Sequence, residues 1–132
     1  MKIEAVHILP TNNTPEVMLN PNGIISIKGR AIDESRAKYS EPILEWIDTY
    51  LHNPANVTEV SIALEYLNSY NSIILASILR KLIQVNLQSK SLVVKWYIEE
   101  DDDDLLERGE YTSTSLKIPI EFIMTDQIRS LF

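Results

Sequence analysis

Residues 68–72 (Asn-Ser-Tyr-Asn-Ser) carry the side chains best suited to chemistry, because they lie between an expected buried strand and an expected helix. A hydroxyl at a helix N-terminus is well placed to carry a phosphate, since the free backbone amides and the helix dipole there favour negative charge. Phosphorylation would add about −1.5 to −2 charges to one side chain. The stretch therefore predicts a phosphorylation site, with Ser69 as the first candidate and Ser72 as the second.

The same residues also have a purely structural interpretation. Asn and Ser are strong N-cap residues, whose side chains accept hydrogen bonds from the free N–H groups in the first turn of a helix. Asn68 and Ser69 would then only start the helix. From the residues alone, both interpretations stay open.

The acidic run Glu99–Asp104, followed by Glu107, is a second group of candidate ligands. It lacks the Asp-x-Asp-x-Asp-Gly spacing and the distal glutamate of an EF-hand loop, and it contains no glycine for the sharp turn. We favour a solvated loop whose carboxylates stabilise the start of the next helix, with an interaction surface or a Ca²⁺ or Mg²⁺ site as alternatives. Trp96 and Tyr97, just before the run, are expected to lie in a strand with one face in the core.

Other arrangements that support catalysis are missing from the sequence. Its three glycines form no Gly-x-Gly-x-x-Gly loop, and no serine stands in a Gly-x-Ser-x-Gly turn. His7 and His52 have no second ligand at metal spacing, so we expect ordinary surface residues rather than metal ligands or general bases. The absence of cysteine excludes disulfides, zinc–thiolate sites, iron–sulfur clusters and thiol catalysis. The sequence therefore predicts a protein that is not an enzyme and uses no metal or cofactor.

Length and charge narrow the class of protein further. The 132 residues suit one domain over 1–132, and 19 acidic against 12 basic residues give a formal net charge of −7. An acidic surface repels nucleic-acid backbones and anionic lipid, so neither is an expected partner. The first ten residues do not resemble a signal peptide, and the longest apolar runs are far shorter than the roughly 18 residues of a spanning helix. We expect a cytoplasmic protein with no direct membrane insertion.

Alternation of apolar and polar residues predicts the strands. In the strand expected over 57–67, the residues that share one face are Val60, Ile62, Leu64 and Tyr66. An Asn-Gly pair at 22–23 supplies the positive φ angles that a tight hairpin turn needs. The expected strands are an edge strand before Pro10, a hairpin over 16–28, and strands over 57–67, 92–98 and 116–124.

Apolar residues at helical spacing predict the helices. The first is expected to take Ser40 as its N-cap and to bury Ile43, Ile47, Tyr50 and Leu51. Strands that alternate with helices predict an α/β fold, a small mixed sheet with helices packed against it. The remaining expected elements are a helix over 73–87 that buries Leu75, Ile78, Leu79, Leu82 and Ile83, a short helix over 105–109, a terminal turn within 125–132, and polar connections over 11–15 and 29–40.

Four stretches, in this order along the chain, resemble one bacterial family. Residues 11–15 match a Thr-x-x-Thr-Pro element, and residues 29–35 look like a Gly-x-Ser-x-x-Glu-Asn element followed by a helix with a tryptophan, here Trp46. Residues 67–71 (Leu-Asn-Ser-Tyr-Asn) look like an aromatic or Leu followed by Asn-Thr-Ser-Ser, and residues 95–109 look like a Trp-x-Tyr strand with an acidic loop. Together they resemble the SiaC-type regulatory phosphoproteins, long catalogued as a domain of unknown function.

That resemblance implies a fold similar to the STAS domain of anti-sigma-factor antagonists, with a phosphorylatable Ser or Thr at a helix N-terminus. It implies that a Ser/Thr protein kinase phosphorylates this residue and that a PP2C-type phosphatase removes the phosphate. It also implies that the unphosphorylated form binds a diguanylate cyclase or another signalling protein, raising cyclic-di-GMP synthesis and favouring aggregation and biofilm. Carried over to this sequence, the phosphoacceptor is Ser69, and the partner-binding residues are Asn68, Ser69, Tyr70 and Asn71.

Departures from the family pattern support keeping rival hypotheses. Ser69 stands where Thr is commoner, Tyr70 and Asn71 replace small hydroxyl residues, and Ile73 stands where Lys is often found. The first hypothesis is a phosphorylation switch. The second is a constitutive protein-interaction adaptor of the same fold, in which the polar residues at the helix start only cap it. The third is an enzyme or small-ligand binder that uses the acidic run with a divalent metal.

Overall fold

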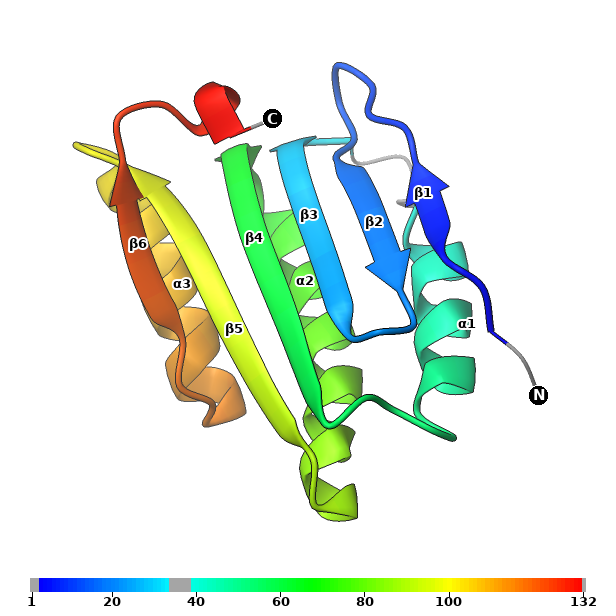
Figure 1. Ribbon diagram of the computed structural model, residues 1–132. Coiled ribbons are helices and arrows are strands. Elements are labelled where there is room, and N and C mark those ends of the chain that lie inside the picture. The colour runs from blue at the N-terminus through cyan, green and yellow to red at the C-terminus, as the bar shows by residue number, and fades with distance from the viewer. Residues whose placement is uncertain (1–2, 34–38, 132) are drawn as a thin grey trace.

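A mixed six-stranded sheet forms the centre of the computed structural model, which describes residues 3–33 and 39–131 (Figure 1). Within these residues the strands lie side by side in the order of the chain. The first three strands pair antiparallel, and the third to sixth pair parallel. The strands are β1 (Val6–Ile8), β2 (Glu16–Asn20), β3 (Ile24–Ala31), β4 (Val57–Leu67), β5 (Ser91–Glu99) and β6 (Glu121–Thr125).

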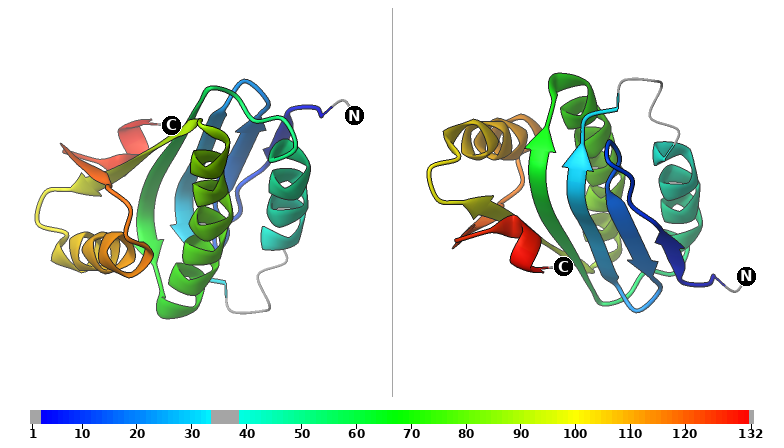
Figure 2. Two further views of the ribbon diagram at one scale, coloured as in Figure 1. Left: turned by 90° about the horizontal axis from the view of Figure 1, so that it is seen from below. Right: turned by 90° about the horizontal axis from the view of Figure 1, so that it is seen from above.

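Each parallel pair of strands is joined by a connection that contains an α-helix, as parallel pairing requires. These helices are α1 (Ser40–Tyr50), α2 (Ser69–Leu82) and α3 (Asp103–Leu116), and all of them lie on one face of the sheet (Figure 2). The 3₁₀ helix η1 (Ile83–Gln88) continues α2, and a second, η2 (Ile128–Leu131), packs on β4 and β5 from the opposite face. The predicted α/β class, a mixed sheet with helices packed against it, is confirmed.

The hairpin between β2 and β3 forms at the predicted turn. Gly23 has a φ of +98°, and its backbone N–H donates to the carbonyl of Asn20 at 2.9 Å. A Cβ at this position would lie 2.3 Å from the carbonyl oxygen of Val57, so both the backbone conformation and the close approach require glycine.

The hydrophobic core lies between the sheet and the three helices. From α1 it receives Ile43, Ile47 and Tyr50, as predicted, and also Trp46, whose ring stacks on that of Tyr50 with centroids 5.0 Å apart. Leu51 is only partly buried at the edge of this core. From the sheet and α2 the core receives Val60, Ile62, Leu64, Leu67, Leu75, Ile78, Leu79, Leu82, Val94, Trp96 and Ile98.

A bulge in β4 places Tyr66 on the face of the strand opposite to the predicted one. Gly29 of β3 pairs with Leu64, but the next residue, Arg30, pairs with Tyr66, so Glu65 is left over in the ladder. An extra residue reverses the alternation beyond it. Tyr66, which was expected to face the core, is therefore 53% exposed, and Leu67 is buried instead.

Two helix boundaries differ from the sequence prediction. The second helix begins at Ser69 rather than at 73, since residues 69–72 form its first turn, and its last part, from Ile83, is a 3₁₀ helix. The third runs over 103–116 rather than 105–109. Gly109 and the Ser/Thr-rich residues after it have low helix propensity, but packing overrides it, because Gly109 is buried against the rings of Phe122 and Trp96, where a Cβ would lie 2.6 Å and 3.0 Å from ring carbons.

Three smaller boundaries also shift. Tyr39 occupies the N-cap position of α1 without a side-chain cap hydrogen bond, and the predicted cap, Ser40, is the first helical residue. The predicted connection over 29–40 begins within β3, and Glu34, Ser35 and Arg36 lie outside the described residues. The last strand starts at Glu121 rather than at 116, beyond Pro119, which cannot donate to a ladder.

Candidate functional site

The site is built where β4 ends and α2 begins. Asn68 has an extended backbone (φ −90°, ψ 174°), and its Oδ1 accepts a hydrogen bond from the backbone N–H of Asn71 at 2.9 Å. Asn68 is therefore the N-cap of α2. Ser69, the next residue, is exposed, and its hydroxyl makes no hydrogen bond within the described part of the chain.

A buried polar network fixes this helix start from beneath. Asn71 is 1% exposed, and its Nδ2 donates to Asn68 Oδ1 at 2.8 Å and to the carbonyl of Asp33 at 3.0 Å. Its Oδ1 accepts from the hydroxyl of Tyr39. Asn68 Nδ2 in turn donates to the carbonyl of Ile32 at 2.9 Å. The network ties the chain after β3 and the start of α1 to the first turn of α2, so Asn71 organises the site from within and offers no surface to a partner.

Tyr39 is held in its neutral, donating form. Burial raises the pKa of the Tyr39 phenol above its ordinary value, and the neighbouring Tyr70 and Asp33 raise it further. A phenol that keeps its proton fixes which atom of the Asn71 amide faces it, since only the carbonyl oxygen can accept.

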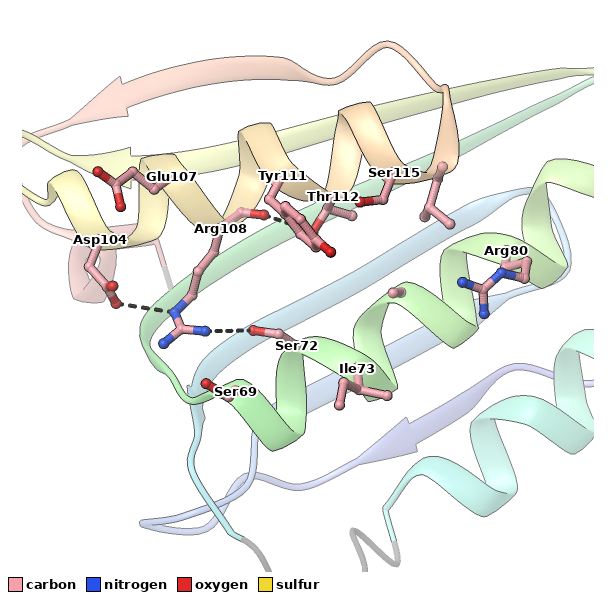
Figure 3. Close-up of a pocket in the computed structure, with 12 residues that line it drawn as sticks. Ser69, Ser72, Ile73, Arg80, Asp104, Glu107, Arg108, Tyr111, Thr112 and Ser115 are labelled. Carbon is pink, nitrogen blue, oxygen red and sulfur yellow. Dashed lines mark hydrogen bonds and ion pairs between the residues drawn. The ribbon is translucent and has the colours of Figure 1, made fainter.

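A groove of about 740 Å³ lies between α2 and α3, with Ser69 at one end (Figure 3). We call it the α2–α3 groove. Its lining combines serine hydroxyls, two arginines, two carboxylates and apolar side chains. The lining residues are Ser69, Ser72, Ile73, Ala76, Arg80, Asp104, Glu107, Arg108, Tyr111, Thr112, Ser115 and Leu116.

Arg108 bridges the two helices at the same end of the groove (Figure 3). Its Nε lies 3.2 Å from Asp104 Oδ2, and its Nη1 donates to Ser72 Oγ at 3.2 Å. Ser72 Oγ itself donates to the carbonyl of Asn68 at 2.9 Å. The Ser72 hydroxyl is therefore already engaged as donor and acceptor, unlike that of Ser69. A second hollow of about 460 Å³, on the β4 side of the helix start, is also lined by Asp104 and Arg108.

Exposed apolar and aromatic side chains line the two hollows or lie next to Ser69 in the sequence. Ile73 and Tyr111 line the α2–α3 groove, Tyr66 lines the second hollow, and Tyr70 follows Ser69 directly. All four are exposed, Ile73 by 68% and Tyr111 by 75%. We call these four residues the apolar rim. Large exposed apolar and aromatic side chains are residues that protein interfaces use as anchors. One of the four, Tyr66, already has the Arg30 guanidinium over its ring, 4.4 Å from the centroid.

The acidic run starts α3. Asp102 Oδ1 accepts from the backbone N–H of Leu105 at 3.2 Å, and Asp103 and Asp104 lie in the first turn, where carboxylates stabilise the helix dipole. This geometry agrees with the favoured interpretation of the run. Among the described residues, no group of three His, Cys, Asp or Glu side chains is arranged to hold a metal ion.

The two histidines lie in ordinary surface settings. His7 Nε2 is 2.7 Å from Glu16 Oε2, across the β1–β2 pair. His52 Nδ1 is 3.2 Å from the carbonyl oxygen of Thr49, just after α1. Trp96 is 1% exposed, which confirms that it belongs to the core.

The parts of the site that the sequence did not reveal are Arg108 and three residues of the apolar rim, Tyr66, Ile73 and Tyr111; the fourth, Tyr70, is among the predicted partner-binding residues. Arg108 follows Asp104 by four residues, a spacing that signals an ion pair once both are known to be helical. Its approach to Ser72, 36 residues earlier, depends on the packing of α3 beside α2.

The fold and the site together define the class of protein: a mixed α/β domain with its helices on one face of the sheet and an exposed serine at the start of a helix. A family model described as SiaC family regulatory phosphoprotein matches residues 8–125, and the chain belongs to this family. No curated protein matches the sequence. In the described residues, no helix is long and apolar enough to cross a membrane.

Solved structures from Pseudomonas aeruginosa share the fold. Apo-SiaC superposes with a TM-score of 0.80 at 20% identity, covering 92% of this chain and 99% of that one. A crystal structure of the diguanylate cyclase SiaD in complex with its activator SiaC matches with a TM-score of 0.81 at 19% identity, covering 91% of this chain and 99% of that one. At these identities the likeness establishes the fold.

Proposed function

We propose that this chain is a non-enzymatic switch, which binds a signalling protein when Ser69 is unmodified and releases it when Ser69 is phosphorylated. The observation that supports this most directly is the exposed Ser69 hydroxyl at the start of α2, beside a groove and a rim of exposed apolar side chains. In the forward step a kinase transfers the γ-phosphoryl group of ATP to Ser69 Oγ, with loss of the hydroxyl proton and release of ADP. A PP2C-type phosphatase would return the hydroxyl by hydrolysis.

Ser69 is a better acceptor than Ser72. A kinase needs a hydroxyl that can enter its own active site, and the Ser69 side chain is exposed without an internal partner among the described residues. Ser72 Oγ is only partly exposed, and its hydrogen bonds to Asn68 and Arg108 would have to break first.

The partner in this proposal is a protein that packs on the apolar rim. Tyr66, Tyr70, Ile73 and Tyr111 supply exposed apolar area on β4, α2 and α3, the elements that form the two hollows, and aromatic residues of this kind dominate many interfaces. Membership of the family, and the relative that forms a complex with a diguanylate cyclase as its activator, support a diguanylate cyclase as this partner. Binding would then promote cyclic-di-GMP synthesis. We infer that residues 1–132 act as one regulatory domain, in the cytoplasm where ATP and a kinase are available.

A phosphate on Ser69 would oppose this docking in two ways. It adds about −1.5 to −2 charges that a partner seated on the apolar rim would have to desolvate. It also makes the net charge of the groove lining negative, since without the phosphate two arginines balance the carboxylates of Asp104 and Glu107. A coupling of roughly 2–3 kcal/mol, usual for such switches, corresponds to a loss of partner affinity of about 30- to 150-fold.

The experiment combines mapping with binding. Peptide mass spectrometry of the protein from its native host should locate one phosphoryl group on Ser69. Activation of a diguanylate cyclase from that host is then measured with Ser69→Ala, Ser69→Glu and the control Ser115→Ala, since Ser115 is an exposed serine of the same groove. We expect Ser69→Ala and Ser115→Ala to activate and Ser69→Glu to fail. Equal activation by all three, with no phosphate found, would favour a constitutive adaptor that uses the same rim.

A further inference from the structure

The side chain of Arg108 is held in place by two weak partners. Its ion pair with Asp104 lies at the surface, where the Asp104 side chain is 71% exposed, and such pairs contribute little. Its second partner, Ser72 Oγ, is a neutral hydroxyl at 3.2 Å. A stronger acceptor within reach would therefore displace both.

Ser69 places such an acceptor next to Arg108 once it is phosphorylated. Ser69 and Ser72 are three residues apart on α2, so they lie on one side of the helix, one turn from each other. Figure 3 shows both serine side chains and the Arg108 guanidinium facing the same end of the α2–α3 groove. A phosphate extends the Ser69 side chain and brings three strong acceptor oxygens toward this guanidinium.

We propose that Arg108 receives the phosphate of Ser69 and leaves Asp104 in doing so, a step that rests on the proposed switch at Ser69. The planar guanidinium binds phosphate in a bidentate manner, and a dianion attracts it more strongly than one exposed carboxylate does. At present Arg108 of α3 contacts Ser72 of α2 and Asp104 of its own helix. After phosphorylation it would contact the phosphate on Ser69 of α2 in place of both. This exchange leaves the net charge of the site unchanged, but Asp104, which lines both hollows, loses its cation, so a partner meets an unpaired carboxylate there.

The test introduces phosphoserine at position 69 during translation in the full chain, so it does not depend on the native kinase. Phosphorus NMR follows the second pKa of the phosphate in the folded protein, because a bound cation favours the dianion. With Arg108 present we expect this pKa to lie about half a unit to one unit below that of the urea-unfolded protein. Arg108→Gln should remove most of the difference.

Two matched variants separate this role from a general effect of charge or folding. Arg80→Gln removes an arginine from the same groove, on α2 beyond the first turn, and should leave the phosphate pKa unchanged. Asp104→Asn removes the competing carboxylate and should lower the phosphate pKa further. The proposal is overturned if Arg108→Gln and Arg80→Gln behave alike, or if Asp104→Asn raises the pKa. Either result would leave the proposed switch itself intact, since that stands on kinase modification and partner binding.

Discussion

Replacing Asn68 and Ser69 one at a time should separate the structural role of the helix start from its signalling role. The Asn68 side chain makes three hydrogen bonds, accepting from the backbone N–H and the Nδ2 of Asn71 and donating to the carbonyl of Ile32. Loss of the cap costs about 1 kcal/mol, and each of the other two bonds contributes about 0.5–1.5 kcal/mol. We therefore expect Asn68→Ala to lower the free energy of unfolding by roughly 2–4 kcal/mol.

Ser69→Ala should change that free energy by less than about 0.5 kcal/mol, because the Ser69 hydroxyl is exposed and makes no bond within the described residues. Urea denaturation followed by circular dichroism measures both variants, and in a thermal scan Asn68→Ala should melt roughly 7–14 °C below the parent. Asn68→Asp is the matched control, since it keeps the cap acceptor but loses the donor to Ile32, so it should fall between the two. If Ser69→Ala destabilised the protein as much as Asn68→Ala, Ser69 would be part of the cap and the assignment would be refuted.

Two further predictions concern packing and pH. Gly109→Ala should lower the unfolding free energy by roughly 1–3 kcal/mol, because the new Cβ would lie 2.6 Å from a ring carbon of Phe122 and 3.0 Å from one of Trp96. A melting temperature equal to that of the parent would contradict this contact. The raised pKa of Tyr39 means that, above about pH 10, the unfolded chain loses this proton while the folded chain keeps it, so stability falls as pH rises. Denaturation midpoints measured between pH 9 and 11 should show a steeper fall for the parent than for Tyr39→Phe, and parallel curves would count against burial as the cause.

The elements with strong periodicity could be predicted from the sequence, and β4 was located at Val57–Leu67 as expected. The bulge in β4 could not be predicted. It arises because Glu65 has no partner in the ladder with β3, and the residues of β4 alone do not specify how the two strands pair. This is why Tyr66 was wrongly placed in the core, although its exposure now makes it part of the apolar rim.

The candidate site was predicted only in its local part. Asn and Ser types marked the start of α2, and the structure assigns the cap to Asn68 alone. Arg108 could not be found because its helix was predicted to end one residue after it, as Gly109 is a poor helix former. The packing of Gly109 against Phe122 and Trp96 outweighs that local preference, and α3 continues to Leu116.

The order of the strands has a consequence for how the chain assembles on the ribosome. In the described part of the chain, every strand after the first pairs with the one made just before it, so the sheet can grow strand by strand as synthesis proceeds. Ser69 emerges with the fourth strand and its helix, whereas Arg108 follows 39 positions later along the same sequence. In a nascent chain the serine is therefore available before the arginine that bridges its helix to the next, and the two-helix site is completed only as the last strands join.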